Sequence, residues 1–451
     1  MRFVLIFLLL LTVGEIFGQY SLKGVIGNYN RRDISICSQF GDESKLIEAV
    51  STDQNGEFEF AYSDQPVGLY RLYLDTQDYF DLIFNKENIE IKTKIENPQY
   101  NMEIMQSDEN TQLYSYIIAN YISQYKIDIL SELLNIYPDG KFRNKVESEL
   151  SKELKHKNKN LEKVIKQDAE SFAGRYLNSF REISIPSKFN DYEKSEYLKK
   201  NYLELYEFND LSLLNSNAYT MIVLNYFKLF RSNDPEVYYT AGHEVLDYIF
   251  FEDPKIFNFI FEYILSGFES LGLDEQAAKL SVEFGDLCSD GNDNLKMRIR
   301  SNTELSVGKK APDFTAITVS GEQYTLSEMK SDYTLIVFWA TWCEHCKITM
   351  PRLAAASNIF NESNMEIVAV SIDSDEDVLR NFLKENEMPW DVICEYKGWD
   401  GEIVIDYAVF ATPSMYIIDK NMNIVAKPYN EERLYNELEK ILTDKSSNDN
   451  K

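Results

Sequence analysis

Two cysteines separated by two residues are spaced so that they could carry out thiol–disulfide exchange. They are Cys343 and Cys346, and they directly follow the apolar run 335–339, which predicts a buried strand. A helix that begins at this junction turns its unpaired amides and the positive end of its dipole towards Cys343, which favours the thiolate. Cys346 lies one helical turn later, within reach of Cys343. The pair could therefore exchange two electrons with a disulfide, with Cys343 attacking and Cys346 resolving the mixed disulfide.

A zinc site is the competing interpretation of such a pair. Zinc would need a second cysteine pair, or histidines at ligand spacing. The other cysteines, Cys37, Cys288 and Cys394, are single and widely separated, and neither His156 nor His243 has a partner at ligand spacing. We therefore expect no metal, and we predict that the three remaining cysteines are buried single thiols.

The elements that must position the pair alternate between strands and helices. After the strand at 335–339, the pattern predicts a helix to about residue 360, a strand at 367–372, a helix at 375–387, strands at 414–419 and 424–426, and a last helix at 430–442. This order describes a mixed sheet flanked by helices.

Two prolines add to the specificity of the pattern. Pro351 falls in the first turns of the helix that carries the pair, where it should kink the helix. Thr412 and Pro413 precede the strand at 414–419. A cis peptide there would bring the backbone alongside the cysteines and expose an edge for a peptide substrate. Thr412 and Pro413 are therefore the predicted substrate-binding residues.

The first two thirds of the chain carry no comparable motif. Residues 19–105 show a period of two with turn signals, as in Phe58, Phe60 and Tyr62, and predict six or seven short strands in an antiparallel β-sandwich. Residues 106–303 change to a helical period and predict an all-α middle region. Its apolar stripes are interpreted as core packing. One stripe comprises Tyr114, Ile117, Ile118, Tyr121, Ile122 and Tyr125, and another follows Asp253-Pro254.

The first eighteen residues resemble a secretory signal. Met1 and Arg2 precede an apolar run at 3–13, and Gly18 is a small residue at a plausible cleavage position. We predict a signal peptide at 1–18 and a periplasmic or cell-envelope protein; an uncleaved membrane anchor is the alternative. The polar end of the chain, 446–451, is predicted to be a disordered tail.

Composition narrows the classes of partner. The chain has 451 residues, so several domains are expected, and its 74 acidic against 46 basic residues give a net charge of -28. This charge excludes the electrostatic attraction on which nucleic-acid binding depends. Five cysteines are far too few for a scaffold held together by disulfides, so the fold must depend on apolar burial.

Residues 307–442 resemble the thioredoxin-fold envelope reductases of the TlpA/ResA type, within the AhpC/TSA superfamily. The resemblance rests on four segments: Ala311-Pro312-Asp313-Phe314, residues 338–346, Pro351, and residues 407–413. It implies an α/β thioredoxin fold over 304–445, with Cys343 as the exposed nucleophile, Cys346 as the resolving thiol and Pro413 as a cis-proline. The two preceding regions are similar to the β-rich and helical segments that precede such domains in envelope proteins of Bacteroidetes-type bacteria.

Departures from the family pattern concern the direction of electron flow. Thioredoxins carry a buried Asp where this chain has Val337, and Glu344 is the candidate to replace it. Glu344 resembles the reductases, whereas His345 resembles oxidising and isomerase-type relatives; a charged His345 would stabilise the thiolate and Glu344 would oppose it. Thr349 stands where relatives often have Glu. Glu344, His345 and Trp342 are the predicted tuning residues.

The leading hypothesis is a periplasmic thiol:disulfide oxidoreductase with no cofactor beyond its own redox-active disulfide. It would reduce disulfides of client proteins and be re-reduced by a membrane thiol donor. An oxidant or isomerase-type enzyme remains an alternative. A thiol peroxidase is another, although Ala340 stands where that motif needs Thr and no Pro precedes it locally. The third alternative is a client-binding module with an accessory redox domain, whose first two domains could also form oligomers.

Overall fold

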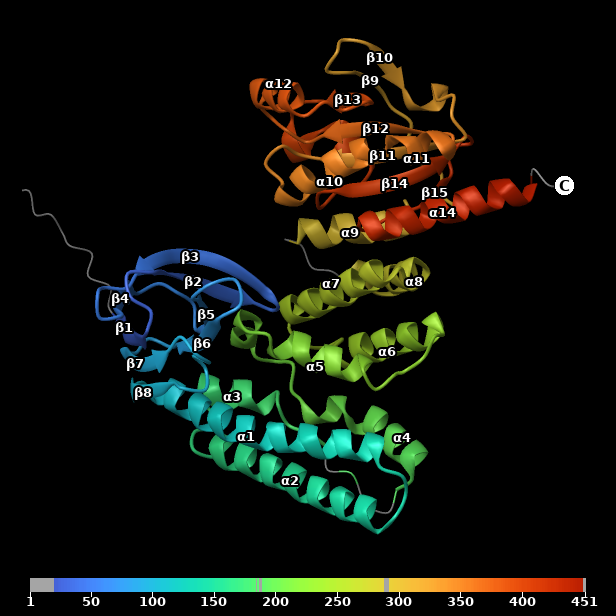
Figure 1. The fold of residues 1–451 in the computed structure, drawn as a ribbon. Helices are drawn as coiled ribbons and strands as arrows, with labels where there is room; N and C mark the ends of the chain where they lie inside the picture. Colours follow the sequence, from blue (N-terminus) through green and yellow to red (C-terminus); the bar gives the residue numbers. More distant parts are fainter. Residues whose placement is uncertain (1–19, 184, 186–188, 288–291, 449–451) are drawn as a thin grey trace, which may run out of the picture. The chain divides into compact units, whose positions relative to one another are not determined.

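The computed structural model describes most of the chain (Figure 1). The described residues are 20–183, 185, 189–287 and 292–448. The predicted signal peptide at 1–18 and the thiol of Cys288 lie outside them. Within these ranges, no helix combines the length and the apolar character that a membrane span requires.

The elements cluster into two compact units, Met1–Leu229 and Phe230–Lys451. The second boundary at which the sequence changes character, 303/304, falls inside the second unit. Helices that the sequence groups into one middle region are thus divided, and the later ones belong with the C-terminal sheet.

Two four-stranded sheets form the start of the first unit, in the orders β4-β1-β7-β8 and β3-β2-β5-β6. Their strands are β1 (Tyr20–Gly27), β2 (Asp33–Phe40), β3 (Glu43–Ser51), β4 (Glu57–Tyr62), β5 (Gly68–Tyr73), β6 (Tyr79–Phe84), β7 (Ile89–Lys94) and β8 (Glu103–Gln106). Phe58, Phe60 and Tyr62 are buried, as their alternation predicts. The ring of Phe84 stacks on that of Tyr62 at 4.5 Å, so side chains of the two sheets meet.

The strand-rich first region is therefore confirmed, although the structure describes eight strands in it and not the six or seven predicted. One pairing differs from the expected antiparallel arrangement, because β1 and β7 run parallel. The difference has a topological reason. The strands of the second sheet, β2, β3, β5 and β6, lie between β1 and β7 in the chain, so these two are not joined by a hairpin that would force them antiparallel.

The helical part of the first unit is attached to the edge of β6. Asn110 accepts a hydrogen bond from the Ile83 amide at 2.8 Å and donates to the Ile83 carbonyl at 2.9 Å, as a neighbouring strand would. The Tyr114 hydroxyl donates to the carbonyl of Asp81 at 2.8 Å. These contacts join α1 to the sheet and satisfy the edge of β6 at this point.

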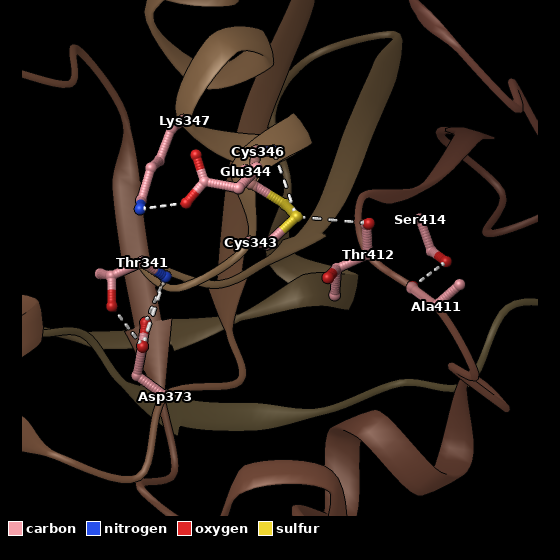
Figure 2. The surroundings of a disulfide bond; sticks show 9 residues. All are labelled: Thr341, Cys343, Glu344, Cys346, Lys347, Asp373, Ala411, Thr412 and Ser414. Atoms are coloured by element: carbon pink, nitrogen blue, oxygen red, sulfur yellow. Dashed lines mark hydrogen bonds and ion pairs between the residues drawn. A yellow bond between two sulfur atoms is a disulfide. The ribbon is translucent and has the colours of Figure 1, made fainter. Parts of the chain in front are cut away.

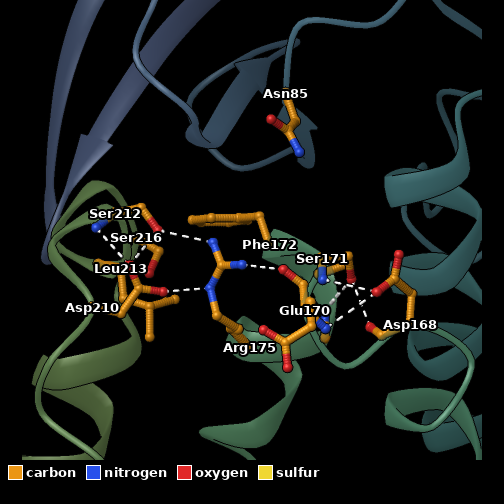
Figure 3. A network of polar contacts seen from close by, with 12 residues as sticks. Asn85, Asp168, Glu170, Ser171, Phe172, Arg175, Asp210, Ser212, Leu213 and Ser216 are labelled. Atoms are coloured by element: carbon orange, nitrogen blue, oxygen red, sulfur yellow. Dashed lines mark hydrogen bonds and ion pairs between the residues drawn. The ribbon is translucent and has the colours of Figure 1, made fainter.

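Polar contacts also hold the later helices of this unit. Its helices are α1 (Asp108–Ile136), α2 (Lys141–Ile165), α3 (Phe172–Asn178), α4 (Asp191–Asn201) and α5 (Ala218–Phe227), with 3-10 turns at Leu203–Leu205 and Leu211–Asn215. Arg175 of α3 donates hydrogen bonds to Asp210 at 2.5 Å and to Ser212 at 3.3 Å (Figure 3). The guanidinium thereby ties α3 to the start of the second turn.

The apolar stripe predicted to be core is largely on the surface of α1. Ile118, Tyr121, Ile122 and Tyr125 are 38%, 46%, 56% and 64% exposed. The prediction of core packing is wrong for these four residues. The buried face of α1 instead contains Leu113, Tyr116, Ser123 and Ile127, among others. Because apolar residues occur on both faces of this helix, periodicity alone could not identify the buried one.

The second unit opens with helices that pack on one another, and the last of them contacts the C-terminal sheet through Ser301 and Tyr416. They are α6 (Pro235–Tyr248), α7 (Pro254–Leu271), α8 (Asp274–Phe284) and α9 (Asp293–Thr303). The predicted start of α7 is confirmed, because Asp253 accepts a hydrogen bond from the Lys255 amide at 2.8 Å and Pro254 is the first helical residue. Ile256, Ile260 and Ile264 are buried.

The C-terminal sheet has the order β13-β12-β11-β14-β15 and is mixed, as the sequence predicts. The five strands of this sheet are β11 (Tyr333–Trp339), β12 (Met365–Ser371), β13 (Asp391–Cys394), β14 (Ser414–Asp419) and β15 (Ile424–Ala426). The other elements of this region are β9 (Thr315–Ile317), β10 (Gln323–Thr325), α10 (Glu344–Ala355), α11 (Ser357–Glu362), α12 (Glu376–Glu385), α13 (Glu402–Asp406) and α14 (Glu431–Asn448). The thioredoxin-like fold of this region is thus confirmed. Three short strands, β9, β10 and β13, were not predicted, and α14 extends three residues into the expected tail.

Candidate functional site

The cysteine pair lies at the junction of β11 and α10 (Figure 2). Cys343 and Cys346 form a disulfide, with their Cα atoms 5.2 Å apart. Cys343 is the N-cap of α10, and the amide of Cys346 donates to its sulfur at 3.1 Å. Cys346 is completely buried, whereas Cys343 is 8% exposed. Cys343 is therefore the residue with the helix amides and the greater accessibility of the two, although it is buried and not exposed as the resemblance implies.

The predicted substrate loop lies beside this sulfur. The carbonyl oxygen of Thr412 is 3.4 Å from Cys343 Sγ, and in the reduced protein a Cys343 thiol could donate to it. The peptide bond between Thr412 and Pro413 is cis. Ser414, the first residue of β14, donates to the carbonyl of Ala411 at 2.7 Å and closes the turn. The structure thus brings together the cysteines and the loop, which are almost 70 residues apart in the chain.

The three predicted tuning residues all lie on the surface. Glu344 is exposed and forms an ion pair with Lys347 at 2.6 Å. His345 is exposed, with no hydrogen bond or ion pair to any residue that the structure describes. Trp342 is 53% exposed, and its ring centre lies 6.1 Å from that of Trp399. Glu344 consequently does not occupy the buried position of the missing acid.

The buried position itself is apolar. Val337 is completely buried in β11, and Thr349, which stands where relatives often have Glu, is also buried. Pro351 lies inside α10 as predicted, and the helix ends four residues after it. No carboxylate of the predicted set therefore reaches the interior near the pair.

A carboxylate that the sequence analysis missed lies behind the active loop. Asp373 is 2% exposed and accepts hydrogen bonds from the Thr341 amide at 3.1 Å and the Thr341 hydroxyl at 2.6 Å. It also accepts from the Ser371 hydroxyl at 2.7 Å. Asp373 thereby fixes the backbone two residues before Cys343. The signal was present, because Asp373 follows β12, whose carboxyl end lies beside that of the parallel strand β11.

Cys394 belongs to the same network. Its thiol donates to the carbonyl oxygen of Asp373 at 3.2 Å, and its sulfur accepts from the Tyr396 amide at 3.4 Å. Burial raises the pKa of the Cys394 thiol, and burial also raises the pKa of the Cys37 thiol in β2. Both are buried single thiols, as predicted. Among the described residues, His, Cys, Asp and Glu side chains form no cluster of three able to hold a metal.

A charged cluster joins α7 and α9 to the segment that follows β15. Glu269 of α7 accepts from Arg298 and from Asn302 of α9, each at 2.9 Å. Lys427, after β15, donates to the carbonyl and hydroxyl of Ser301 at 2.7 and 2.8 Å. Burial lowers the pKa of Lys427 to about 8, and the charge of Glu269 opposes this shift. These contacts join α7 and α9 to the sheet of the redox domain.

Comparison with known proteins concerns mainly this C-terminal region. A family model described as the AhpC/TSA family matches residues 307–427. The chain is 30% identical over 122 residues to the thiol-disulfide oxidoreductase ResA of Bacillus thuringiensis, which covers 27% of this chain and 69% of that protein. It is 33% identical over 119 residues to the thioredoxin-like protein YneN of Bacillus subtilis, covering 26% of this chain and 67% of the relative.

Solved structures from Bacteroides are also similar to the chain. The thioredoxin domain of a thiol-disulfide oxidoreductase from Bacteroides vulgatus is 28% identical, with 30% of this chain and 98% of that chain covered and a TM-score of 0.29. A thioredoxin-like protein from Bacteroides caccae is 19% identical, with 57% of this chain and 96% of that chain covered and a TM-score of 0.42.

Proposed function

The chain belongs to the AhpC/TSA family as a thioredoxin-like thiol:disulfide oxidoreductase, and from this premise we propose that it reduces disulfides of client proteins in the cell envelope. The observation that carries the proposal is the position of Cys343. Its sulfur caps α10, accepts a hydrogen bond from the Cys346 amide and lies beside the Thr412 carbonyl. Cys343 is also the more accessible cysteine of the disulfide.

The exchange needs only these two cysteines and the client. In the reduced protein, the Cys343 thiolate attacks one sulfur of the client disulfide, a mixed disulfide forms, and the other client sulfur leaves as a thiolate. Cys346 then loses its proton and attacks Cys343, which forms the internal disulfide and releases the second client thiol. Two electrons pass in total to the client, whose two sulfurs take up one proton from Cys346 and one from solvent, into which Cys343 released its own. Helix amides at the N-cap favour the attacking thiolate throughout.

Three of the chain's residues would place the client. An extended client segment could pair with the backbone at Thr412 and Pro413, which holds its disulfide next to Cys343. Trp342 offers half of its surface beside the sulfur and is suited to an apolar client side chain. These three roles are part of the proposal, and they rest on the family resemblance together with the position of each residue in the structure.

The proposal includes a location in the cell envelope and a source of electrons. We expect residues 1–18 to be removed on export, so that the mature protein begins at Gln19 and receives electrons from a thiol donor in the membrane. Cell fractionation with N-terminal sequencing tests the location of the protein and the position of cleavage. A cytoplasmic protein that keeps Met1 would contradict it.

The function is tested by reduction of insulin and by the equilibrium potential against glutathione. We expect the reduced protein to accelerate insulin reduction and the Cys346→Ser variant to accumulate mixed disulfides with clients. A potential near those of strong oxidants, together with no insulin reduction, would overturn the reductase direction in favour of the oxidant alternative. Peroxide turnover by Cys346→Ser would instead favour the thiol peroxidase.

A further inference from the structure

The first unit contains a cavity of about 460 Å³ that has no assigned role. One wall is the second sheet, with Arg71 of β5 and Asp81 of β6. The other walls come from α1, with Tyr116 and Tyr121, and from α3, with Tyr176. The volume falls within the range of small-molecule sites, about 300 to 1,000 Å³. The cavity lies far in sequence from the family match at 307–427, so the redox chemistry does not explain it.

Tyrosine dominates the lining of this cavity. Six of its residues are Tyr79, Tyr100, Tyr116, Tyr121, Tyr125 and Tyr176. The rings of Tyr100 and Tyr121 stack at 3.8 Å, and both residues remain more than 40% exposed. Such rings offer an apolar face for packing and a hydroxyl for hydrogen bonding in the same side chain. A ligand with one apolar face and a polar periphery suits this lining.

The cavity also holds neutral hydrogen-bonding groups whose capacity is unused. Tyr116 is only 4% exposed, and its hydroxyl bonds to none of the described residues. The amide oxygen of Asn120 is itself buried, and it has no partner within the described part of the chain. Buried polar groups are nearly always hydrogen-bonded, so unused groups at a cavity wall indicate a ligand or water that completes them.

Charge excludes an anion as this ligand. Arg71 is the one cation among the described lining residues, and its Nε and Nη2 donate to the two carboxylate oxygens of Asp81, at 2.7 and 2.9 Å. Asp128 at the rim adds a negative charge, and the whole chain carries -28. A phosphate or carboxylate would therefore find no free positive partner.

An extended peptide is also disfavoured at this place. A peptide commonly binds a sheet by adding a strand to its edge. At Ile83 the edge of β6 is already satisfied by the side chain of Asn110, and the Asp81 carbonyl is occupied by Tyr114. The remaining chemistry is that of a small, uncharged ligand with many hydroxyls.

We propose that this cavity binds a neutral carbohydrate of one or two sugar rings. The apolar face of a ring packs against the tyrosines of α1, and its hydroxyls complete the bonding of Tyr116 and Asn120. The Arg71–Asp81 pair, planar and neutral overall, offers further donors and acceptors to adjacent hydroxyls. Sugar binding by the first unit is independent of the cysteine chemistry in the second.

Calorimetry on the full chain tests the proposal with four neutral disaccharides as probes: maltose, cellobiose, lactose and diacetylchitobiose. We expect at least one to bind. We expect Tyr121→Ala to weaken that binding about tenfold through loss of ring packing, and Tyr116→Phe to weaken it several-fold through loss of one hydroxyl. Tyr192→Ala is the matched control, because Tyr192 is 75% exposed on α4 and lies outside the cavity.

Binding of none of the four sugars overturns the proposal, as does binding that Tyr121→Ala and Tyr116→Phe both leave unchanged. Binding of inorganic phosphate or of an uncharged tetrapeptide in place of the sugars also overturns it. Tyr121 is half exposed and Tyr116→Phe keeps the ring, so both variants should fold, which their thermal unfolding will verify. Insulin reduction should be the same in all variants, which separates this result from the redox function.

Discussion

The two units of this protein place their polar chemistry in opposite ways. In the second unit the reacting atoms lie three residues apart and share one helix start, so local backbone geometry sets their relation. In the first unit the polar groups of the cavity come from β5, β6, α1 and α3, and only tertiary packing brings them together. A local site can be recognised in a sequence, whereas a dispersed site becomes visible only in the fold.

Loss of the attacking sulfur should give the largest effect. It tests whether the redox activity depends on this one position in the local site. We expect Cys343→Ser to abolish insulin reduction, because it removes the sulfur that caps α10 and that we assign as the nucleophile. Cys394→Ser is the matched control in the same domain, since a serine hydroxyl can keep both hydrogen bonds of this thiol, to the Asp373 carbonyl and from the Tyr396 amide. The measurement is the rate of insulin reduction by the reduced proteins. Residual activity of Cys343→Ser above background would contradict the assignment of the nucleophile.

Loss of a dispersed contact should instead damage one unit as a whole. Arg71→Ala leaves Asp81 buried without its cation, and breaking a buried pair in this way costs about 3 to 5 kcal/mol of folding free energy. Denaturant unfolding of the first unit measures the loss, and insulin reduction by the second unit should persist at low denaturant. The control is Lys23→Ala, whose ion pair with Glu59 is exposed and worth at most about 1 kcal/mol. Equal losses in the two variants would contradict the role of burial.

The same contrast explains what the sequence could and could not predict. The buried strand, the cysteine spacing and the Thr412-Pro413 motif are local signals, and the structure places them together as expected. The stripe on α1 was misassigned, because the face that a helix buries depends on its neighbours in space. Strands of three or four residues, such as β9 and β13, are too short to show a period. Asp373 went unnoticed because its partner Thr341 is 32 residues away.

Asp373 combines features of the local and the dispersed site. It follows a different strand, β12, but it accepts hydrogen bonds from Thr341 in the loop that leads to Cys343. Asp373→Asn places an amide NH₂ where a carboxylate oxygen accepts from Thr341 or Ser371. We expect a loss of about 1 to 3 kcal/mol in the free energy of unfolding and slower alkylation of Cys343 across the pH range, because the loop before it loosens. Asp377→Asn, an exposed isosteric change, is the control. Unchanged alkylation in Asp373→Asn would show that the residue has no positioning role.

The last prediction concerns the cluster that joins α7 and α9 to the redox domain, and its effect is expected only at alkaline pH. Burial lowers the pKa of Lys427 to about 8 in the folded protein, below its ordinary value of 10.5, while Glu269 and Asp274 face it and oppose the shift. Between these two pH values the unfolded chain binds more protons than the folded one. The contribution of Lys427 to stability therefore rises from pH 8 to 10.5, with a slope of at most about 1.4 kcal/mol per pH unit. Denaturant unfolding of the wild type and Lys427→Met across this range should show the rise only in the wild type, with Lys420→Met at the exposed turn behaving as the wild type does. Parallel curves for the wild type and Lys427→Met would mean that this cluster, although it is assembled from distant segments, does not hold a buried charge, and would weaken the contrast between local and dispersed polar sites.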